Sequence, residues 1–221
     1  ALAEKADVVL LYTGLDEVTE AEGLDRPNIN FPQNQADLAH ELAHAGHKVV
    51  ALVFAGSSVK LGWADECDAL LFAYLPGQAG ARAALDLVTG RAVPSGKLAE
   101  TFPFKYHDCS SKNNFPGKEK TVEYREGIYI GYRYYDTASV SVKYPFGYGL
   151  SYTTFAYSDY EVNEKGVSFT IENTGDYDGK EIAELYVSMV NGKVFRPVKE
   201  LKGYKKVFIK KGEKVRVEIP F

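Results

Sequence analysis

Residues Lys48 to Ala55 read Lys-Val-Val-Ala-Leu-Val-Phe-Ala, a nearly continuous apolar run. Such a run is typical of a strand that is covered on both faces, as strands are in a parallel sheet flanked by helices. Two further apolar runs, at 8–12 and 69–74, have the length of buried strands. Segments with helical spacing lie at 33–45 and 78–89. This alternation predicts an α/β layer with a parallel sheet of about three strands.

From Tyr152 onward the hydrophobic period changes to two. Turn signals separate the alternating runs, among them Glu164-Lys165-Gly166 and Asn173-Thr174-Gly175-Asp176. Short alternating strands at such intervals predict an antiparallel β-sandwich. The apolar positions of these runs are Val167, Phe169, Ile171, Ala183, Leu185, Val187, Val215, Val217 and Ile219.

We therefore expect an α/β fold with a partial parallel-sheet α/β sandwich, followed by an antiparallel β-sandwich. The predicted domain ranges are 1–104 for the α/β part, 105–151 for an aromatic-rich linker and interface, and 152–221 for the β-sandwich. Within the linker, Tyr124 to Asp136 alternates enough to predict an extended strand. Aromatic-rich segments form either sugar-stacking platforms or packed interfaces, and burial of tyrosine rings with bonded hydroxyls favours the interface.

The polar loop from Asp16 to Pro32 is the main candidate for a functional site. It holds five carboxylates and follows a predicted strand, where open α/β sheets place their ligands. A carboxyl group acts as a general acid near neutral pH only when burial or a nearby negative charge keeps it protonated. Glu20 and Glu22 are the candidates, Gly23 permits a sharp turn, and Asp25 with Arg26 could pair and hold the loop. The alternative is a solvated acidic surface loop.

The run from Glu20 to Gln35 resembles the acid/base loop in the second domain of glycoside hydrolase family 3. That family has a Glu-x-Glu-Gly-x-Asp-Arg run, then a Leu-Pro-like pair and a helix. Phe31-Pro32 stands here where Leu-Pro is usual. The resemblance implies that Glu22, directly before the glycine, is the general acid/base. Glu20 is the second candidate, and Gly23, Asp25 and Arg26 are expected to position the loop.

Further segments match the same family in the same order. Trp63, Pro76-Gly77-Gln78 and Pro94-Ser95-Gly96-Lys97-Leu98 resemble the remainder of its second domain. The runs 124–136 and 144–155 resemble its link to a fibronectin type III-like third domain. Arg196 to Tyr204 resembles part of that third domain. The resemblance thus covers nearly the whole chain.

The family resemblance implies retaining hydrolysis of a β-linked, non-reducing-end sugar, with no metal or organic cofactor. A β-glucoside or oligosaccharide is the expected substrate, and a β-xyloside is an alternative. The family's nucleophile is an aspartate on a barrel domain that these residues do not resemble. We therefore expect this chain to be part of a larger enzyme, inactive alone, with the barrel supplied in cis or by another chain.

Two alternatives come from other functional classes. The first is a non-catalytic module that binds carbohydrate or a protein partner. The second is a zinc metalloprotease, because His40-Glu41-Leu42-Ala43-His44 satisfies His-Glu-x-x-His, with Glu66 or His47 as a third ligand. Leu38 and Leu42 are expected to form the buried stripe of this helix, which places both histidines on its outward face.

Charge and cysteine content exclude some partners. The net charge is −4 with acids and bases interspersed, so no nucleic-acid or membrane-binding face is expected. No apolar run has the length of a membrane span, and no leader-like segment opens the chain. Two cysteines, Cys67 and Cys109, cannot build a disulfide framework. These features do not determine the cellular compartment, although they weakly favour the cytoplasm.

Overall fold

The computed structural model describes residues 2–117 and 120–221, so residues 1, 118 and 119 of the predicted domain ranges lie outside the described residues. The chain forms two compact units, each built from separate stretches of sequence. The α/β unit comprises Ala1–Leu85, Glu100–Gly127 and Ser141–Tyr144. The β-rich unit comprises Asp86–Ala99, Ile128–Val140 and Pro145–Phe221. The domain ranges predicted from sequence remain a prediction.

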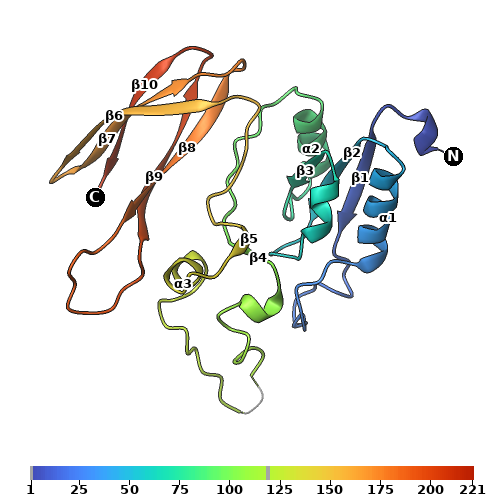
Figure 1. The fold of residues 1–221 in the computed structure, drawn as a ribbon, viewed down its shortest axis with the longest axis horizontal. Helices are drawn as coiled ribbons and strands as arrows, with labels where there is room; N and C mark the ends of the chain where they lie inside the picture. Colours follow the sequence, from blue (N-terminus) through green and yellow to red (C-terminus); the bar gives the residue numbers. More distant parts are fainter. Residues whose placement is uncertain (1, 118–119) are drawn as a thin grey trace. The chain divides into compact units, whose positions relative to one another are not determined.

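The α/β unit contains a three-stranded parallel sheet in the order β1-β2-β3 (Figure 1). The strands are β1 (Val9–Gly14), β2 (Val49–Phe54) and β3 (Ala69–Phe72). Central strand β2 is the run that the sequence marked as buried, and four of its side chains have no exposed surface: Val49, Ala51, Leu52 and Val53. The prediction of a small parallel sheet is therefore confirmed.

Helix α1 (Gln33–His44) packs on this sheet through a small apolar cluster. Buried Leu11, Ala39 and Val49 form its centre, and Leu42 and Trp63 pack against it. The expected stripe is therefore half wrong, because Leu38 is 50% exposed and Ala39 takes the inward position. A small side chain lets the helix backbone approach the strands closely, which a leucine at that position would prevent.

The end of α1 has the geometry of a Schellman motif. Gly46 adopts φ +80, and its N–H donates to the Ala43 carbonyl at 2.9 Å. The next residue, His47, donates from its N–H to the Leu42 carbonyl at 3.2 Å. These two bonds satisfy helix carbonyls that would otherwise lack donors, and glycine adopts the required left-handed conformation without strain.

Short elements complete the α/β unit. They are the 3₁₀ turns η1 (Ala3–Lys5), η2 (Gly62–Glu66) and η3 (Tyr106–Asp108), and the strand pair β4 (Phe102–Pro103) and β5 (Val142–Tyr144). Helix α2 (Gly80–Val88) follows β3 and crosses the division between the units. The buried ring of Phe102 lies edge-on to Phe72 and Tyr144, with ring centroids 4.8 and 6.4 Å away.

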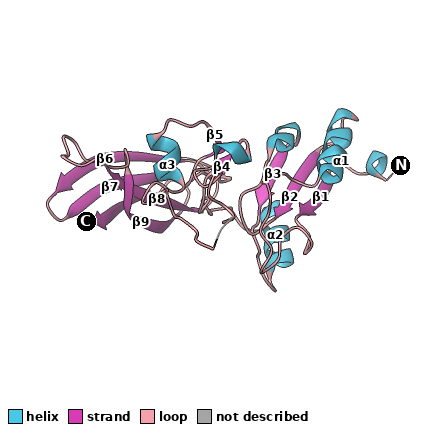
Figure 2. Ribbon diagram, turned by 90° about the horizontal axis from the view of Figure 1, so that it is seen from below, coloured by secondary structure: helices cyan, strands magenta, loops and turns pink. Residues whose placement is uncertain are grey.

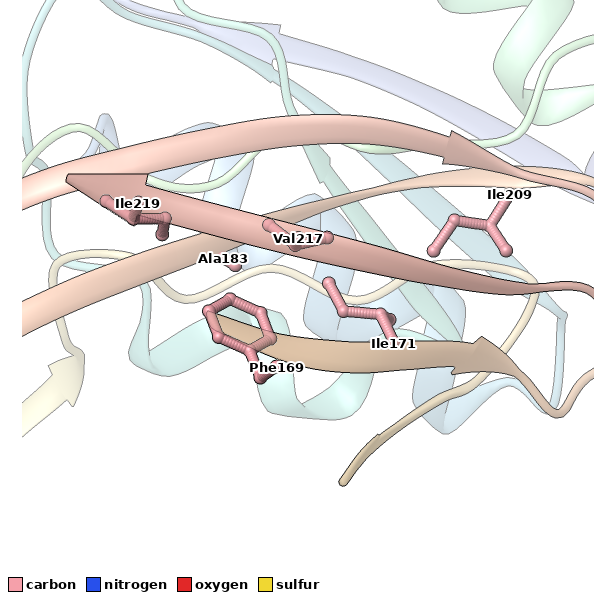
Figure 3. Packing of buried hydrophobic residues seen from close by; sticks show 6 residues of the cluster. All are labelled: Phe169, Ile171, Ala183, Ile209, Val217 and Ile219. Carbon is pink, nitrogen blue, oxygen red and sulfur yellow. The ribbon is translucent and has the colours of Figure 1, made fainter. Parts of the chain in front are cut away.

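The β-rich unit is formed by antiparallel strands in two sheets (Figure 2). One sheet has the order β10-β7-β6 and the other pairs β8 with β9. Figure 3 shows side chains from both sheets in one core, which agrees with the predicted period-two pattern. Its members are Phe169, Ile171, Ala183, Ile209, Val217 and Ile219. The strands are β6 (Phe155–Asn163), β7 (Gly166–Asn173), β8 (Gly179–Val187), β9 (Glu200–Ile209) and β10 (Lys214–Pro220).

The extended strand predicted over 124–136 is wrong. Gly127 and Gly131 adopt φ +56 and +54, which interrupts extension, and helix α3 (Tyr132–Thr137) follows. Tertiary contacts hold this helix: the Tyr132 ring packs on Phe146 at 5.1 Å and edge-on to Tyr186 at 5.7 Å. The Tyr132 hydroxyl also accepts the Leu201 N–H at 2.7 Å. These partners are distant in sequence, so local alternation did not predict them.

Asn173 is a fully buried polar residue at the end of β7. Its amide nitrogen donates to the carbonyls of Tyr177 and Ile209, at 2.8 and 2.9 Å. Its amide oxygen accepts from the Thr153 hydroxyl at 2.6 Å and from the Gly175 N–H at 3.2 Å. All hydrogen-bonding positions of the side chain are thus used, which offsets the cost of burying it.

Within the described residues, no helix is both long and apolar enough to span a membrane.

Candidate catalytic loop

The candidate loop leaves the sheet at the carboxyl end of β1 and ends where α1 begins. The side chain of Gln35 closes its base, accepting the Gly14 N–H at 2.8 Å and donating to the Gly14 carbonyl at 3.0 Å. A Cβ at Gly14 would lie 2.3 Å from the Phe54 carbonyl oxygen, so this position requires glycine. The loop therefore begins and ends at a point fixed by the sheet and the first turn of α1.

The first part of the loop is a local turn built on Asp16. Its carboxylate accepts the Thr19 N–H at 2.8 Å, and its carbonyl accepts the Glu20 N–H at 2.8 Å. Hydrogen bonds from Thr19 lower the pKa of Asp16 below its ordinary value. This carboxylate is therefore ionised and used locally, which makes it a poor candidate for a general acid.

Glu20 is tied to the neighbouring strand end. Its Oε2 atom accepts the Gly56 N–H at 2.8 Å, directly after β2. A Cβ at Gly56 would lie 3.1 Å from Glu20 Oε1 and 3.1 Å from the Leu75 side chain, so glycine permits the close approach. The Glu20 carboxylate thus has a structural partner and is only partly exposed.

Glu22 lies at the corner of a tight turn and is exposed. The Leu24 N–H donates to the Ala21 carbonyl at 3.2 Å, and Gly23 adopts φ +81, as the third residue of a type II turn requires. Across residues 2–117 and 120–221, no hydrogen bond or ion pair engages the Glu22 carboxylate. The turn therefore presents this carboxyl group outward, toward solvent.

Arg26 connects the loop to the segment after β2. Its Nη2 atom donates to the Ser57 hydroxyl at 2.8 Å and to the Ser58 carbonyl at 3.0 Å. The guanidinium thus bonds to these serines rather than to neighbouring Asp25, which is exposed. Buried Ile29 adds a second attachment, because its carbonyl accepts the Lys60 N–H at 2.7 Å.

Glu100 is a neighbour of this attachment that the sequence did not indicate. Burial raises the pKa of Glu100 above its ordinary value, although hydrogen bonds with Ser58 and the charge of Arg26 act in the opposite direction. Glu100 also lies close enough to Glu20 for their charges to interact. No local pattern in Ala99-Glu100-Thr101 predicts that Glu100 lies near the loop, because Ser58, Arg26 and Glu20 come from another part of the chain.

A surface pocket adjoins the loop within the α/β unit. Its lining includes Glu20, Leu24, Arg26, Ser57, Tyr106 and Phe115. Glu22 does not line this pocket. The second candidate glutamate therefore faces the body of the α/β unit, whereas Glu22 lies outside its concave surface.

The histidines of the His-Glu-x-x-His pattern lie elsewhere. His40 and His44 are exposed on α1, as predicted, and Glu66 rather than His47 lies beside them. His40 Nδ1 is 2.6 Å from Glu66 Oε2. The surface pocket beside the loop includes none of these three residues.

Comparison with known families identifies both parts of the chain. The Glycosyl hydrolase family 3 C-terminal domain matches residues 1–132, and the fibronectin type III-like domain matches residues 181–221. The chain belongs to glycoside hydrolase family 3. The family resemblance drawn from the loop and the later segments is thus confirmed.

Its relatives include several β-glucosidases. The chain is 44% identical to thermostable β-glucosidase B of Acetivibrio thermocellus over 97% of its length, and 42% identical to an exo-α-(1→6)-L-arabinopyranosidase of Bifidobacterium breve over 98%. It covers 30% of each of these relatives. The crystal structure of the Bifidobacterium adolescentis GH3 β-glucosidase matches 99% of the chain with a TM-score of 0.94 at 42% identity, and the chain covers 33% of that structure. A Kluyveromyces marxianus β-glucosidase in complex with glucose matches all of it with a TM-score of 0.91 at 39% identity, with 27% of that structure covered.

Proposed function

We propose that this chain is the acid/base-bearing part of a retaining glycoside hydrolase that removes β-linked sugars from non-reducing ends, with a β-glucoside as the substrate. The observation that carries the proposal is the position of Glu22, exposed at the corner of a glycine turn, with a carboxyl group that no described residue engages. The β-glucosidases among its relatives support the substrate class.

The loop geometry supports Glu22 over Glu20 as the general acid/base. A proton donor must reach the glycosidic oxygen, and the Glu20 carboxylate is already held against the Gly56 N–H. Glu22 lies between two anchored residues, Glu20 on one side and Arg26 on the other, which hold the turn in place. Anchors that flank a free carboxyl restrict its position without consuming its hydrogen-bonding capacity.

In the proposed reaction, an aspartate outside residues 1–221 attacks the anomeric carbon while Glu22 protonates the leaving oxygen. In the second step Glu22 removes a proton from water, which attacks the glycosyl-enzyme and restores both carboxyl groups. Retention of configuration requires the two carboxyls about 5–5.5 Å apart, so the barrel domain that carries the nucleophile must meet this loop.

The test is Glu22→Ala in the full-length enzyme. We expect turnover of cellobiose, which has a poor leaving group, to fall by about 10²–10⁴-fold, the usual contribution of a general acid. Turnover of a substrate with an activated aryl leaving group should fall less, because that leaving group needs less protonation. Azide should restore turnover of the aryl substrate and give the β-glycosyl azide, because an anionic nucleophile needs no general base.

The matched control is Glu17→Ala, which removes another exposed carboxylate from the same loop. We expect it to leave both substrates unaffected. Unchanged cellobiose hydrolysis by the Glu22→Ala enzyme would refute the assignment. Failure of azide to restore turnover of the aryl substrate would also refute it.

A further inference from the structure

A second polar cluster lies on α1, away from the candidate loop. His40 and His44 are one helical turn apart, with ring centroids separated by 3.9 Å. Glu66, at the end of η2, completes the group from another element. One ligand atom from each of the three residues lies within 4.8 Å of the others.

The donor set is that of a borderline divalent transition metal. Imidazole nitrogen and carboxylate oxygen both bind Zn²⁺, and two histidines with one glutamate are a known three-ligand combination. The i, i+4 spacing matters because it places both rings on one face of the helix, so backbone geometry has already brought two ligands together.

The distances are close to those that an ion requires. Zn–N and Zn–O bonds of about 2.0–2.2 Å in a tetrahedral arrangement separate neighbouring donor atoms by about 3.3 Å. His44 Nδ1 and Glu66 Oε2 are 3.5 Å apart. His40 Nδ1 and Glu66 Oε2 are 2.6 Å apart, a hydrogen-bond distance at which a proton lies between them. A metal ion in place of this proton requires these two atoms to separate by about 0.7 Å, and both belong to exposed side chains.

Among residues 2–117 and 120–221, these three residues are the one group of His, Cys, Asp and Glu side chains whose ligand atoms lie close enough to hold an ion. Cys67 follows Glu66, but it packs against the buried cluster of Leu11, Ala39 and Val49. His44 Nδ1 also lies 3.2 Å from the His40 carbonyl, a long contact that ligation at this nitrogen would replace. The three exposed side chains are therefore the accessible donors at this point on the surface.

We propose that His40, His44 and Glu66 bind one Zn²⁺ ion, or a similar divalent transition-metal ion, with water at the remaining coordination position. The ion joins α1 to η2, two elements that otherwise meet through apolar packing around Ala39 and Trp63. Its role is to stabilise the α/β unit, because a ligand that binds only the folded state raises the free energy of unfolding. It takes no part in hydrolysis at the candidate loop.

The test is calorimetric titration of the untagged full chain with ZnCl₂ in a buffer that does not chelate metal. We expect one ion per chain. His44→Ala and Glu66→Gln should each weaken binding by at least about tenfold, because loss of a direct ligand costs at least as much as loss of a supporting group around a metal site. His107→Ala, which removes an exposed histidine outside the cluster, is the control and should bind as the wild type does.

Thermal unfolding supplies an independent measurement. Zn²⁺ should raise the unfolding temperature of the wild type and of His107→Ala, and this rise should disappear in His44→Ala. A Co²⁺-substituted sample should show the visible absorption of four-coordinate Co²⁺ without a thiolate charge-transfer band, and Cys67→Ser should leave that spectrum unchanged. The proposal fails if wild-type protein shows no binding, or if His44→Ala and Glu66→Gln bind Zn²⁺ as tightly as the wild type.

Discussion

Glu20 and Glu22 are separated by a single alanine, yet their carboxylates lie in different surroundings. Glu20 is partly exposed and accepts a backbone N–H from Gly56, whereas Glu22 is exposed at the corner of the turn. The difference follows from the backbone: Gly23 at φ +81 reverses the chain immediately after Glu22. We infer that one residue positions the loop and the other performs the proton transfers.

Glu20→Ala in the full-length enzyme tests this division of roles. Loss of the bond to Gly56 N–H should lower kcat/KM by about 10–10²-fold, since small displacements of a catalytic group are costly. Azide should not rescue the variant, because the general acid/base is still present. Glu20→Gln should retain most activity, because its amide oxygen can accept the same N–H. If azide rescues Glu20→Ala while Glu22→Ala stays active, the two roles must be exchanged.

At the scale of single elements, the end of β7 depends on one buried amide. Asn173 bonds to Thr153, Gly175, Tyr177 and Ile209, so it links four separate positions of the β-rich unit. An apolar residue of similar size could not form these hydrogen bonds, and the buried donors and acceptors among these groups would lose their partner. The polar side chain is therefore a requirement of the surrounding backbone.

Asn173→Ala should destabilise the β-rich unit by about 2–4 kcal/mol, because several buried donors and acceptors lose their partner together. Peptides from β7 and β9 should exchange hydrogen for deuterium faster in the variant than in the wild type, by the factor that this loss of stability predicts. The comparison variant is Thr174→Ala, which removes only the exposed contact between the Thr154 and Thr174 hydroxyls and should change exchange little. Equal effects of the two substitutions would contradict the role assigned to Asn173.

At the scale of the whole molecule, this chain spans about a third or less of the relatives and structures compared with it above. The proposed mechanism needs two carboxyl groups, and the candidate loop supplies the acid/base but not the nucleophile. Under this proposal, hydrolysis requires a larger assembly in which a second domain meets the loop from Asp16 to Pro32.

We expect residues 1–221 alone to release no measurable 4-nitrophenol from 4-nitrophenyl β-D-glucopyranoside, because the proposed mechanism places the nucleophile outside these residues. The full-length enzyme measured in the same assay is the reference, and circular dichroism establishes that the isolated chain is folded. Hydrolysis by the folded chain at a rate comparable with the full-length enzyme would show that its own residues supply the nucleophile.

Much of the architecture was predictable because it depends on local hydrophobic pattern. The apolar run of β2 and the period-two runs around Phe169 and Val217 correspond to strands in the structure. Helix α3 was not predictable, because its tyrosine contacts come from residues far along the chain. The inward position of Ala39 instead of Leu38 was also missed, since a stripe of large residues says nothing about how closely the helix approaches its sheet.

The sequence by itself determined the family, the loop and its two candidate glutamates, because these follow from residue order and short-range pattern. Only the tertiary structure decided how those glutamates differ, since Gly56 and the Arg26 partners Ser57 and Ser58 lie about 30 or more residues away. The same holds for Glu66, which reaches His40 and His44 through the packing of η2 on α1. Hydrogen bonds and ligand sets depend on distances between atoms in space, and the number of residues between two positions does not determine those distances.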